Sequence, residues 1–180
     1  MSGRLQETVF YRDDKFAVAL WEGNAGDSLS IRVSELRSRS DLLCFTVVLR
    51  GGLKMVKPSG AVGWIYHAGA TSDEGGDFDE VGVWQWTALE SPTQELCFAA
   101  LHPEDGTERE AAVHHQGLDV DRGMTVHAKA GSLVVIARGE VSVVLNGEKK
   151  YLHAPAFAKV ENPTELKVVD DGTRVVVVSA

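Results

Sequence analysis

The chain has 180 residues, of which 44% are hydrophobic and 24% are charged, a composition typical of folded globular proteins and not of disordered ones. Its 18 basic and 26 acidic residues give a net charge of -8, and such a surface repels phosphate backbones, so we expect no nucleic-acid partner. No run approaches the roughly 18 apolar residues of a membrane span, and the first residues are polar, so we expect a cytoplasmic protein with no membrane contact.

Short apolar runs, rich in Val, Ile, Phe and Trp and separated by Gly, Asp and Asn, follow one another along the chain. In the first part they predict strands over 8–11, 16–21, 28–33, 43–49, 53–56, 62–67 and 81–89. In the second part they predict strands over 96–101, 110–115, 131–137, 140–145, 149–153, 157–160, 165–169 and 173–180. Only residues 33–39 suggest a helix. Many short strands with turn signals between them predict an all-β protein, a sandwich or barrel.

Two short sequence patterns occur once in the first part of the chain and again in the second part. Residues 48–56 and 136–144 share a pattern in which a hydrophobic strand ends at Arg-Gly and an alternating strand follows at once. Residues 91–96 and 162–166 share a second pattern, in which a Pro-Thr pair precedes a strand. Two matched landmarks in the same order indicate an internal duplication, although strand–Gly–strand patterns also recur by chance.

The duplication predicts two halves, residues 1–105 and 106–180, which meet near the polar stretch 102–109. The first half carries extra residues between the landmarks, rich in Gly, Asp and Glu, which predict a loop insertion near 68–80. We interpret this insertion as a solvated loop or as a flap over a pocket.

Two cysteines and a pair of tryptophans lie inside the predicted strands. We interpret Cys44 and Cys97 as buried reduced thiols, because neither lies in a Cys-x-x-Cys motif or beside a histidine. Trp84 and Trp86 share one face of their strand, since strand side chains alternate between faces. They are core residues or the aromatic lining of a ligand-binding pocket.

Residues 131–180 resemble the later part of a cupin, the RmlC-like jelly roll. The resemblance rests on a strand that runs into Arg138-Gly139, a hairpin at Asn146-Gly147, a short strand that reaches Ala154-Pro155, and Asn162 before the last strands. It implies that the chain folds as two cupin-like halves packed together.

The cupin resemblance also implies where a metal would be held. Cupins usually bind a divalent metal through a His-x-His pair, a nearby Glu and a later His. Counted from Gly139, these positions fall at Thr125 and His127, at 130–131 and at 157–160, where only His127 has a suitable side chain. We therefore predict no metal site and no other cofactor, with His127 as a ligand-binding residue.

In the first half the same count places Arg37 and Arg39 at the His-x-His positions. A guanidinium matches a carboxylate or phosphate, so we predict that both arginines bind such a group; a basic surface turn is the alternative. Residues 32–56 and 97–113 are similar to the HutD/Ves bicupins. This similarity implies a small accessory or regulatory protein that binds a small carboxylate metabolite.

Three functions are compatible with these features. The first is a metal-free bicupin that binds a small polar or carboxylate ligand in an accessory or regulatory role. The second is a cupin enzyme: a metal-dependent oxygenase or isomerase with rearranged histidines, or a metal-free epimerase-like enzyme with a Tyr–His pair such as Tyr151 and His153. The third is an assembly protein, in which 173–180 is an edge or swapped strand of a homodimer. We favour the first and leave catalysis open.

Elemental analysis of protein purified without a chelator tests the metal prediction. We expect far less than one metal ion per chain, because only one of the cupin ligand positions keeps a suitable side chain. Near-stoichiometric iron, manganese, nickel or zinc would contradict this and would direct attention to His67, His114, His115 and His127 as ligands.

Overall fold

The computed structural model describes residues 3–12, 16–32, 41–72, 80–101, 114–145 and 147–179, in which every regular element is a β-strand. These residues include no helix with the length and apolar character needed to cross a membrane. The predicted all-β fold class is confirmed.

Contacts within the chain divide it into unit 1 (Met1–Ala112) and unit 2 (Val113–Ala180). The boundary predicted at residue 105, the helix predicted over 33–39 and most of the insertion predicted near 68–80 fall outside the described residues. These three predictions therefore stay predictions.

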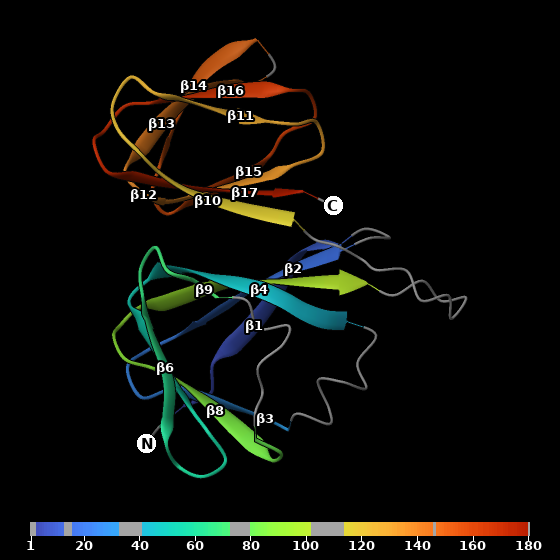
Figure 1. Cartoon of the computed structure of the whole chain (residues 1–180), viewed down its shortest axis with the longest axis vertical. Coiled ribbons are helices and arrows are strands. Elements are labelled where there is room, and N and C mark those ends of the chain that lie inside the picture. The colour runs from blue at the N-terminus through green and yellow to red at the C-terminus, as the bar shows by residue number, and fades with distance from the viewer. Residues whose placement is uncertain are drawn as a thin grey trace. The chain divides into compact units, whose positions relative to one another are not determined.

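Unit 1 consists of two antiparallel sheets (Figure 1). The larger sheet has the strand order β1-β2-β9-β4-β7, and the smaller sheet has the order β3-β8-β5-β6. The strands are β1 (Gln6–Arg12), β2 (Phe16–Gly23), β3 (Ser28–Arg32), β4 (Asp41–Arg50), β5 (Gly52–Val56), β6 (Val62–His67), β7 (Thr71–Ser72), β8 (Val83–Ala88) and β9 (Thr93–Leu101).

Unit 2 also consists of two antiparallel sheets, which form two layers in Figure 1. One sheet has the order β10-β17-β12-β15, and the other has the order β11-β16-β13-β14. The strands are β10 (His114–Val120), β11 (Thr125–Ala128), β12 (Leu133–Arg138), β13 (Glu140–Leu145), β14 (Glu148–His153), β15 (Ala156–Lys159), β16 (Thr164–Val168) and β17 (Thr173–Ser179).

Every strand that the sequence predicts overlaps a strand of the structure. Among the described residues, two strands were not predicted, β7 and β11. The first is only 2 residues long, and the second has 4 residues with a single large apolar side chain, so neither shows a clear apolar periodicity.

The two units share one strand order. In the larger sheet of unit 1, β2-β9-β4-β7 corresponds to β10-β17-β12-β15 of unit 2. The second sheets correspond as well, since β3-β8-β5-β6 matches β11-β16-β13-β14. A matching order across both sheets agrees with the internal duplication that the sequence predicts.

The Arg-Gly landmark marks the same corner in both units. Gly51 follows β4 with φ 67° and Gly139 follows β12 with φ 79°, in the left-handed region where glycine is favoured. At each corner the chain leaves one sheet and enters the other, so that β5 and β13 begin in the second sheet of their unit. Each glycine lies against a threonine at the start of the last strand, Thr93 in unit 1 and Thr173 in unit 2.

The second landmark, the Pro-Thr pattern, does not align the two halves correctly. Residues 91–96 lead into β9, whereas residues 162–166 lead into β16, and the counterpart of β16 in unit 1 is β8. The true counterpart of Thr93 is Thr173, since their hydroxyls donate in the same way to the carbonyls of Glu90 and Asp170. A Pro-Thr pair is a local strand-start signal that recurs at different places in one sandwich, so it does not define the repeat.

The two interiors differ in chemistry. The buried cluster of unit 1 is rich in tryptophan and consists of Leu5, Trp21, Ile31, Val48, Leu53, Met55, Trp84, Trp86, Ala88 and Cys97. The buried cluster of unit 2 is aliphatic throughout and consists of Val120, Val126, Ala128, Val134, Ile136, Val141, Val143, Val160, Leu166, Val168 and Val175. Each cluster draws on both sheets of its unit, so in each unit the core fills the space between the sheets.

Replacement of the corner glycine tests how strongly the fold depends on it. A Cβ added at Gly139 would lie 3.1 Å from the Thr173 Cα, whereas one added at Gly131, which has nearly the same φ, meets nothing within 4 Å. We expect Gly131→Ala to cost about 1–2 kcal/mol for the backbone conformation alone, and Gly139→Ala about 2–5 kcal/mol because overpacking is added. Urea denaturation measures both; equal losses would contradict the role of the corner.

Candidate functional site

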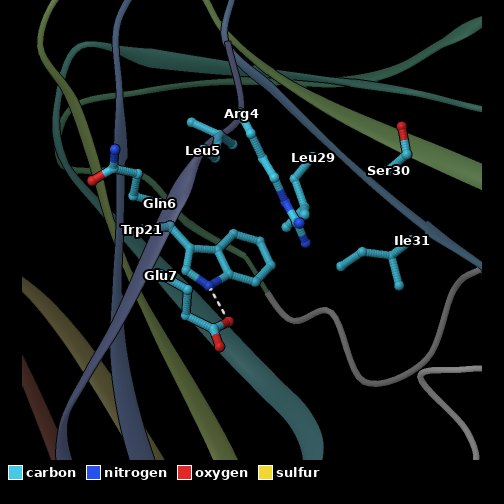
Figure 2. A pocket seen from close by; sticks show the side chains of 8 residues that line it. All are labelled: Arg4, Leu5, Gln6, Glu7, Trp21, Leu29, Ser30 and Ile31. Carbon is cyan, nitrogen blue, oxygen red and sulfur yellow. Dashed lines mark hydrogen bonds between the residues drawn. The ribbon is translucent and has the colours of Figure 1, made fainter.

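A cavity of about 590 Å³ lies in unit 1 (Figure 2). Its lining comes from β1, β2, β3 and the residues before β1: Arg4, Leu5, Gln6, Glu7, Trp21, Leu29, Ser30 and Ile31. The cavity is therefore built by the N-terminal strands of a single unit. Its volume falls within the range of about 300–1,000 Å³ that small-molecule sites occupy.

The segment before β1 is held against the start of β3. Arg4 forms a parallel bridge with Ser28, and the Leu5 N–H donates to the Ser28 carbonyl at 3.3 Å. The Ser28 N–H in turn donates to the Gly3 carbonyl at 3.2 Å. These bonds join the end of the larger sheet to the smaller one and hold Arg4 at the cavity.

Part of the cavity wall consists of apolar side chains from the unit 1 core. Trp21, Leu5 and Ile31 are buried members of the unit 1 core. The indole N–H of Trp21 donates to the Glu7 carboxylate at 2.6 Å. On the core side, the Trp21 ring packs edge to face against Trp86 from the smaller sheet, with centroids 6.4 Å apart.

The rim of the cavity carries one positive and one negative side chain. The Glu7 carboxylate accepts a hydrogen bond from the Trp21 indole (Figure 2). The Arg4 side chain points into the cavity between Trp21 and Ile31, and the described part of the chain provides no carboxylate partner for it. An exposed guanidinium beside an apolar wall can bind a carboxylate group whose carbon skeleton packs on that wall.

A buried carboxylate lies one strand deeper in the same sheet. Glu95 on β9 is directly opposite Trp21 on β2 and opposite Val48 on β4. Its side chain is 1% exposed and lies on the same face as Cys97 of the unit 1 core, two residues further on. The inner face of this sheet thus carries a carboxylate beside the cavity wall.

Of the residues predicted to bind a ligand, the two tryptophans lie in the unit 1 core. Trp84 and Trp86 are both fully buried on β8. The Trp84 ring stacks on Trp64 with centroids 5.7 Å apart, and its N–H donates to the Glu80 carbonyl at 3.0 Å. Trp86 supports the cavity wall from behind through its contact with Trp21. Both fulfil the packing role; a direct ligand contact by either stays a prediction.

Arg37 and Arg39 fall outside the described residues, so their role stays a prediction. His127 lies on the outward face of β11 in unit 2, where its side chain is 73% exposed and its Nδ1 is 3.8 Å from Glu165. Tyr151 and His153 share the exposed face of β14, which is the polar outward face of a hairpin.

The positions counted for a metal do not fit one in unit 2. Thr125 and His127 face away from the core of that unit, and the core itself offers only Val, Leu, Ile and Ala side chains, none of which is a metal ligand. Among the residues that the structure describes, no three His, Cys, Asp or Glu side chains are grouped so that they could hold a metal ion.

Sequence reasoning missed Arg4 and Glu95. Nothing around Arg4 marks it, because the bridge to Ser28 that brings it to the cavity joins residues 24 positions apart. The sequence does contain a signal for Glu95. Cys97 is interpreted as buried, and a residue two positions away on the same strand lies on the same face, so Glu95 is expected to be buried too.

Comparison with known proteins defines the fold. No family model and no curated protein matches the sequence. The chain is similar in structure to a cupin 2 conserved barrel domain protein from Leptotrichia buccalis, with 8% identity, 99% of this chain and 89% of that chain covered, and a TM-score of 0.65. The fold is that of the cupins. This agrees with the fold that the cupin resemblance of the sequence implies, whereas the narrower HutD/Ves similarity stays a prediction.

Other cupin structures are similar over nearly the whole chain. The protein Ylba from E. coli shares 8% identity, with 97% of this chain and 82% of that chain covered and a TM-score of 0.60. A salicylate 1,2-dioxygenase from Pseudaminobacter salicylatoxidans shares 10% identity, with 98% and 76% covered and a TM-score of 0.59. At such low identity the similarity shows the cupin fold alone. The chemistry of the site therefore has to be argued from the residues of this chain.

Substitution of Trp86 and of His127 tests the different roles of a buried and an exposed side chain. Trp86→Ala removes a fully buried indole that supports Trp21, and we expect a loss of about 3–5 kcal/mol of unfolding free energy. His127→Ala changes an exposed side chain, and we expect a change within about 0.5 kcal/mol. Urea denaturation followed by far-ultraviolet circular dichroism measures both; a large loss for His127→Ala would contradict its surface position.

Proposed function

We propose that this cupin is a binding protein whose unit 1 cavity holds a small organic carboxylate, in an accessory or regulatory role. The observation that carries the proposal is the cavity of about 590 Å³ in which the Arg4 guanidinium lies beside an apolar wall. The guanidinium would pair with the carboxylate of the ligand, and Trp21, Leu29 and Ile31 would pack against its carbon skeleton.

The guanidinium of Arg4 supports an anionic ligand, because a carboxylate can pair with it in two parallel hydrogen bonds. Glu7 accepts one hydrogen bond from the Trp21 indole and keeps its negative charge at the same rim. Gln6 and Ser30 supply neutral polar groups at the same rim. In small-molecule sites, convergent polar groups of this kind fix the orientation of the ligand. The HutD/Ves similarity implies the same ligand class, with Arg37 and Arg39 as further candidates for the carboxylate.

An enzymatic role is the alternative, supported by the dioxygenase among the structural neighbours. In many cupins the chemistry is supplied by a metal, and the aliphatic core of unit 2 offers no ligands for one. The features of unit 1 are those of a binding pocket, so binding is the function that the described residues support best. The cytoplasmic location, the absence of nucleic-acid and membrane partners and the homodimer stay predictions.

Binding of small carboxylates to wild-type and Arg4→Gln protein tests the proposal. We expect some members of a thermal-shift screen of mono- and dicarboxylates to raise the Tm of the wild type. For those compounds, Arg4→Gln should raise the calorimetric Kd about 10-fold to 100-fold, because a charge-assisted bond is lost.

Arg122→Gln is the matched control, since it makes the same charge change at an exposed residue of unit 2. It should leave the Kd unchanged. Arg37→Gln and Arg39→Gln in the same series test the two arginines predicted from the sequence. A screen in which no carboxylate shifts the Tm, or an Arg4→Gln protein that binds as the wild type does, would overturn the proposal.

A further inference from the structure

Two side chains of opposite charge line the cavity of unit 1. The Glu7 carboxylate accepts the Trp21 indole N–H through Oε2 at 2.6 Å, which places it at the nitrogen edge of the indole. The Arg4 guanidinium lies between Trp21 and Ile31 (Figure 2). Among the described residues, no ion pair joins Arg4 to Glu7. The cavity thus presents a positive and a negative group at separate places.

The backbone attaches these two groups to different sheets. Glu7 is directly opposite Trp21 in the pairing of β1 with β2, and so belongs to the larger sheet. Arg4 precedes β1 and forms a parallel bridge with Ser28 at the start of β3, which belongs to the smaller sheet. A ligand in the cavity can therefore contact one charged group from each side of the cavity.

Among the described strands, unit 2 has no counterpart of the strand that carries Glu7. Its sheet β10-β17-β12-β15 matches β2-β9-β4-β7, so β1 is an additional strand at the edge of the sheet in unit 1. Trp21 on β2 corresponds to Leu118 on β10, since each is paired with the third residue of the last strand of its unit. The two-sheet arrangement thus forms in unit 2 without the segment that brings Arg4 and Glu7 to the cavity. This difference favours a role in binding for that segment.

Two opposite charges at one cavity select a ligand that carries both signs. A simple carboxylate is attracted by Arg4 and repelled by Glu7, and for a simple ammonium group the two effects are reversed. A zwitterion can place each of its charges beside the opposite one. Its carboxylate can accept two parallel hydrogen bonds from the guanidinium. Its ammonium group can donate to Glu7, because a carboxylate has two acceptor oxygens and the Trp21 indole bonds to Oε2.

We propose that the ligand of the unit 1 cavity is a zwitterionic amino acid, with its carboxylate on Arg4 and its ammonium group on Glu7. Trp21, Leu29 and Ile31 offer apolar surface to the rest of the ligand, which favours an apolar side chain. The inference rests on the proposed function, because it narrows the ligand of the same cavity from carboxylates in general to those that also carry an ammonium group.

Matched sets of probes test the two charged contacts separately. Leucine, 4-methylpentanoate and isopentylamine share one carbon skeleton and carry both charged groups, the carboxylate alone and the ammonium group alone. Phenylalanine, 3-phenylpropionate and 2-phenylethylamine form a second set. For at least one set, we expect calorimetry to show that the wild type binds the amino acid about tenfold more tightly, or better, than either of the other two compounds.

Substitutions of the two charged residues should affect different members of a set. Glu7→Gln should weaken the amino acid about tenfold and leave the simple carboxylate bound as tightly or more tightly, because a repulsion is removed. Arg4→Gln should weaken the amino acid and the simple carboxylate but not the amine. A glutamine carbonyl can still accept the Trp21 indole N–H, so the Tm of ligand-free Glu7→Gln should stay within about 2 °C of the wild type. Glu148→Gln, the same change at an exposed residue of unit 2, is the matched control and should alter no Kd.

The outcomes separate this inference from the proposed function. If simple carboxylates bind as tightly as the amino acids and depend on Arg4, the proposed function stands and the inference falls. If Glu7→Gln weakens all three members of a set by the same factor, Glu7 acts only through its support of Trp21, and the inference again falls. If neither the amino acids nor the simple carboxylates bind the wild type, the proposed function and the inference fall together.

Discussion

The corner between the two sheets of each unit is the constraint on which the rest of the structure depends. At Gly51 and Gly139 the chain leaves one sheet and enters the other with a positive φ. The backbone bonds around the two corners match: Ala68 donates to the Gly51 carbonyl and Ala154 to the Gly139 carbonyl, at 3.0 and 2.9 Å. Because the last strand of each unit packs its first threonine against this glycine, the corner sets the register of both sheets and hence which side chains meet in the core.

The two units thus share one strand order but differ in the side chains that fill their interiors. In unit 2 the space between the sheets is filled with branched aliphatic side chains, an arrangement that serves packing alone. In unit 1 the same space holds tryptophans, a buried glutamate and, at the N-terminal end, an open cavity. We propose recognition for unit 1, which holds the cavity, and a packing role for the aliphatic core of unit 2.

The cupin fold is shared by proteins of different chemistry, among them the dioxygenase similar to this chain. The cavity of this chain has a guanidinium at the rim, an indole that donates a hydrogen bond to a carboxylate, and a second carboxylate on the neighbouring strand. In the ligand class that we propose, the charge of Arg4 at the rim would give affinity.

The sequence by itself determined the strands, the all-β class and the cupin resemblance, because period-two alternation and turn residues act over a few neighbouring positions. It also located the Arg-Gly corner, whose glycines need a backbone conformation that other residues rarely adopt. The tertiary structure alone decided that Arg4 reaches the cavity beside Ile31 and that Trp86 supports the wall instead of lining it. It also showed that the two Pro-Thr patterns, although alike in sequence, begin strands that are not counterparts in the two units. The physical reason is that these outcomes depend on pairing between strands far apart in the chain, which no local pattern encodes.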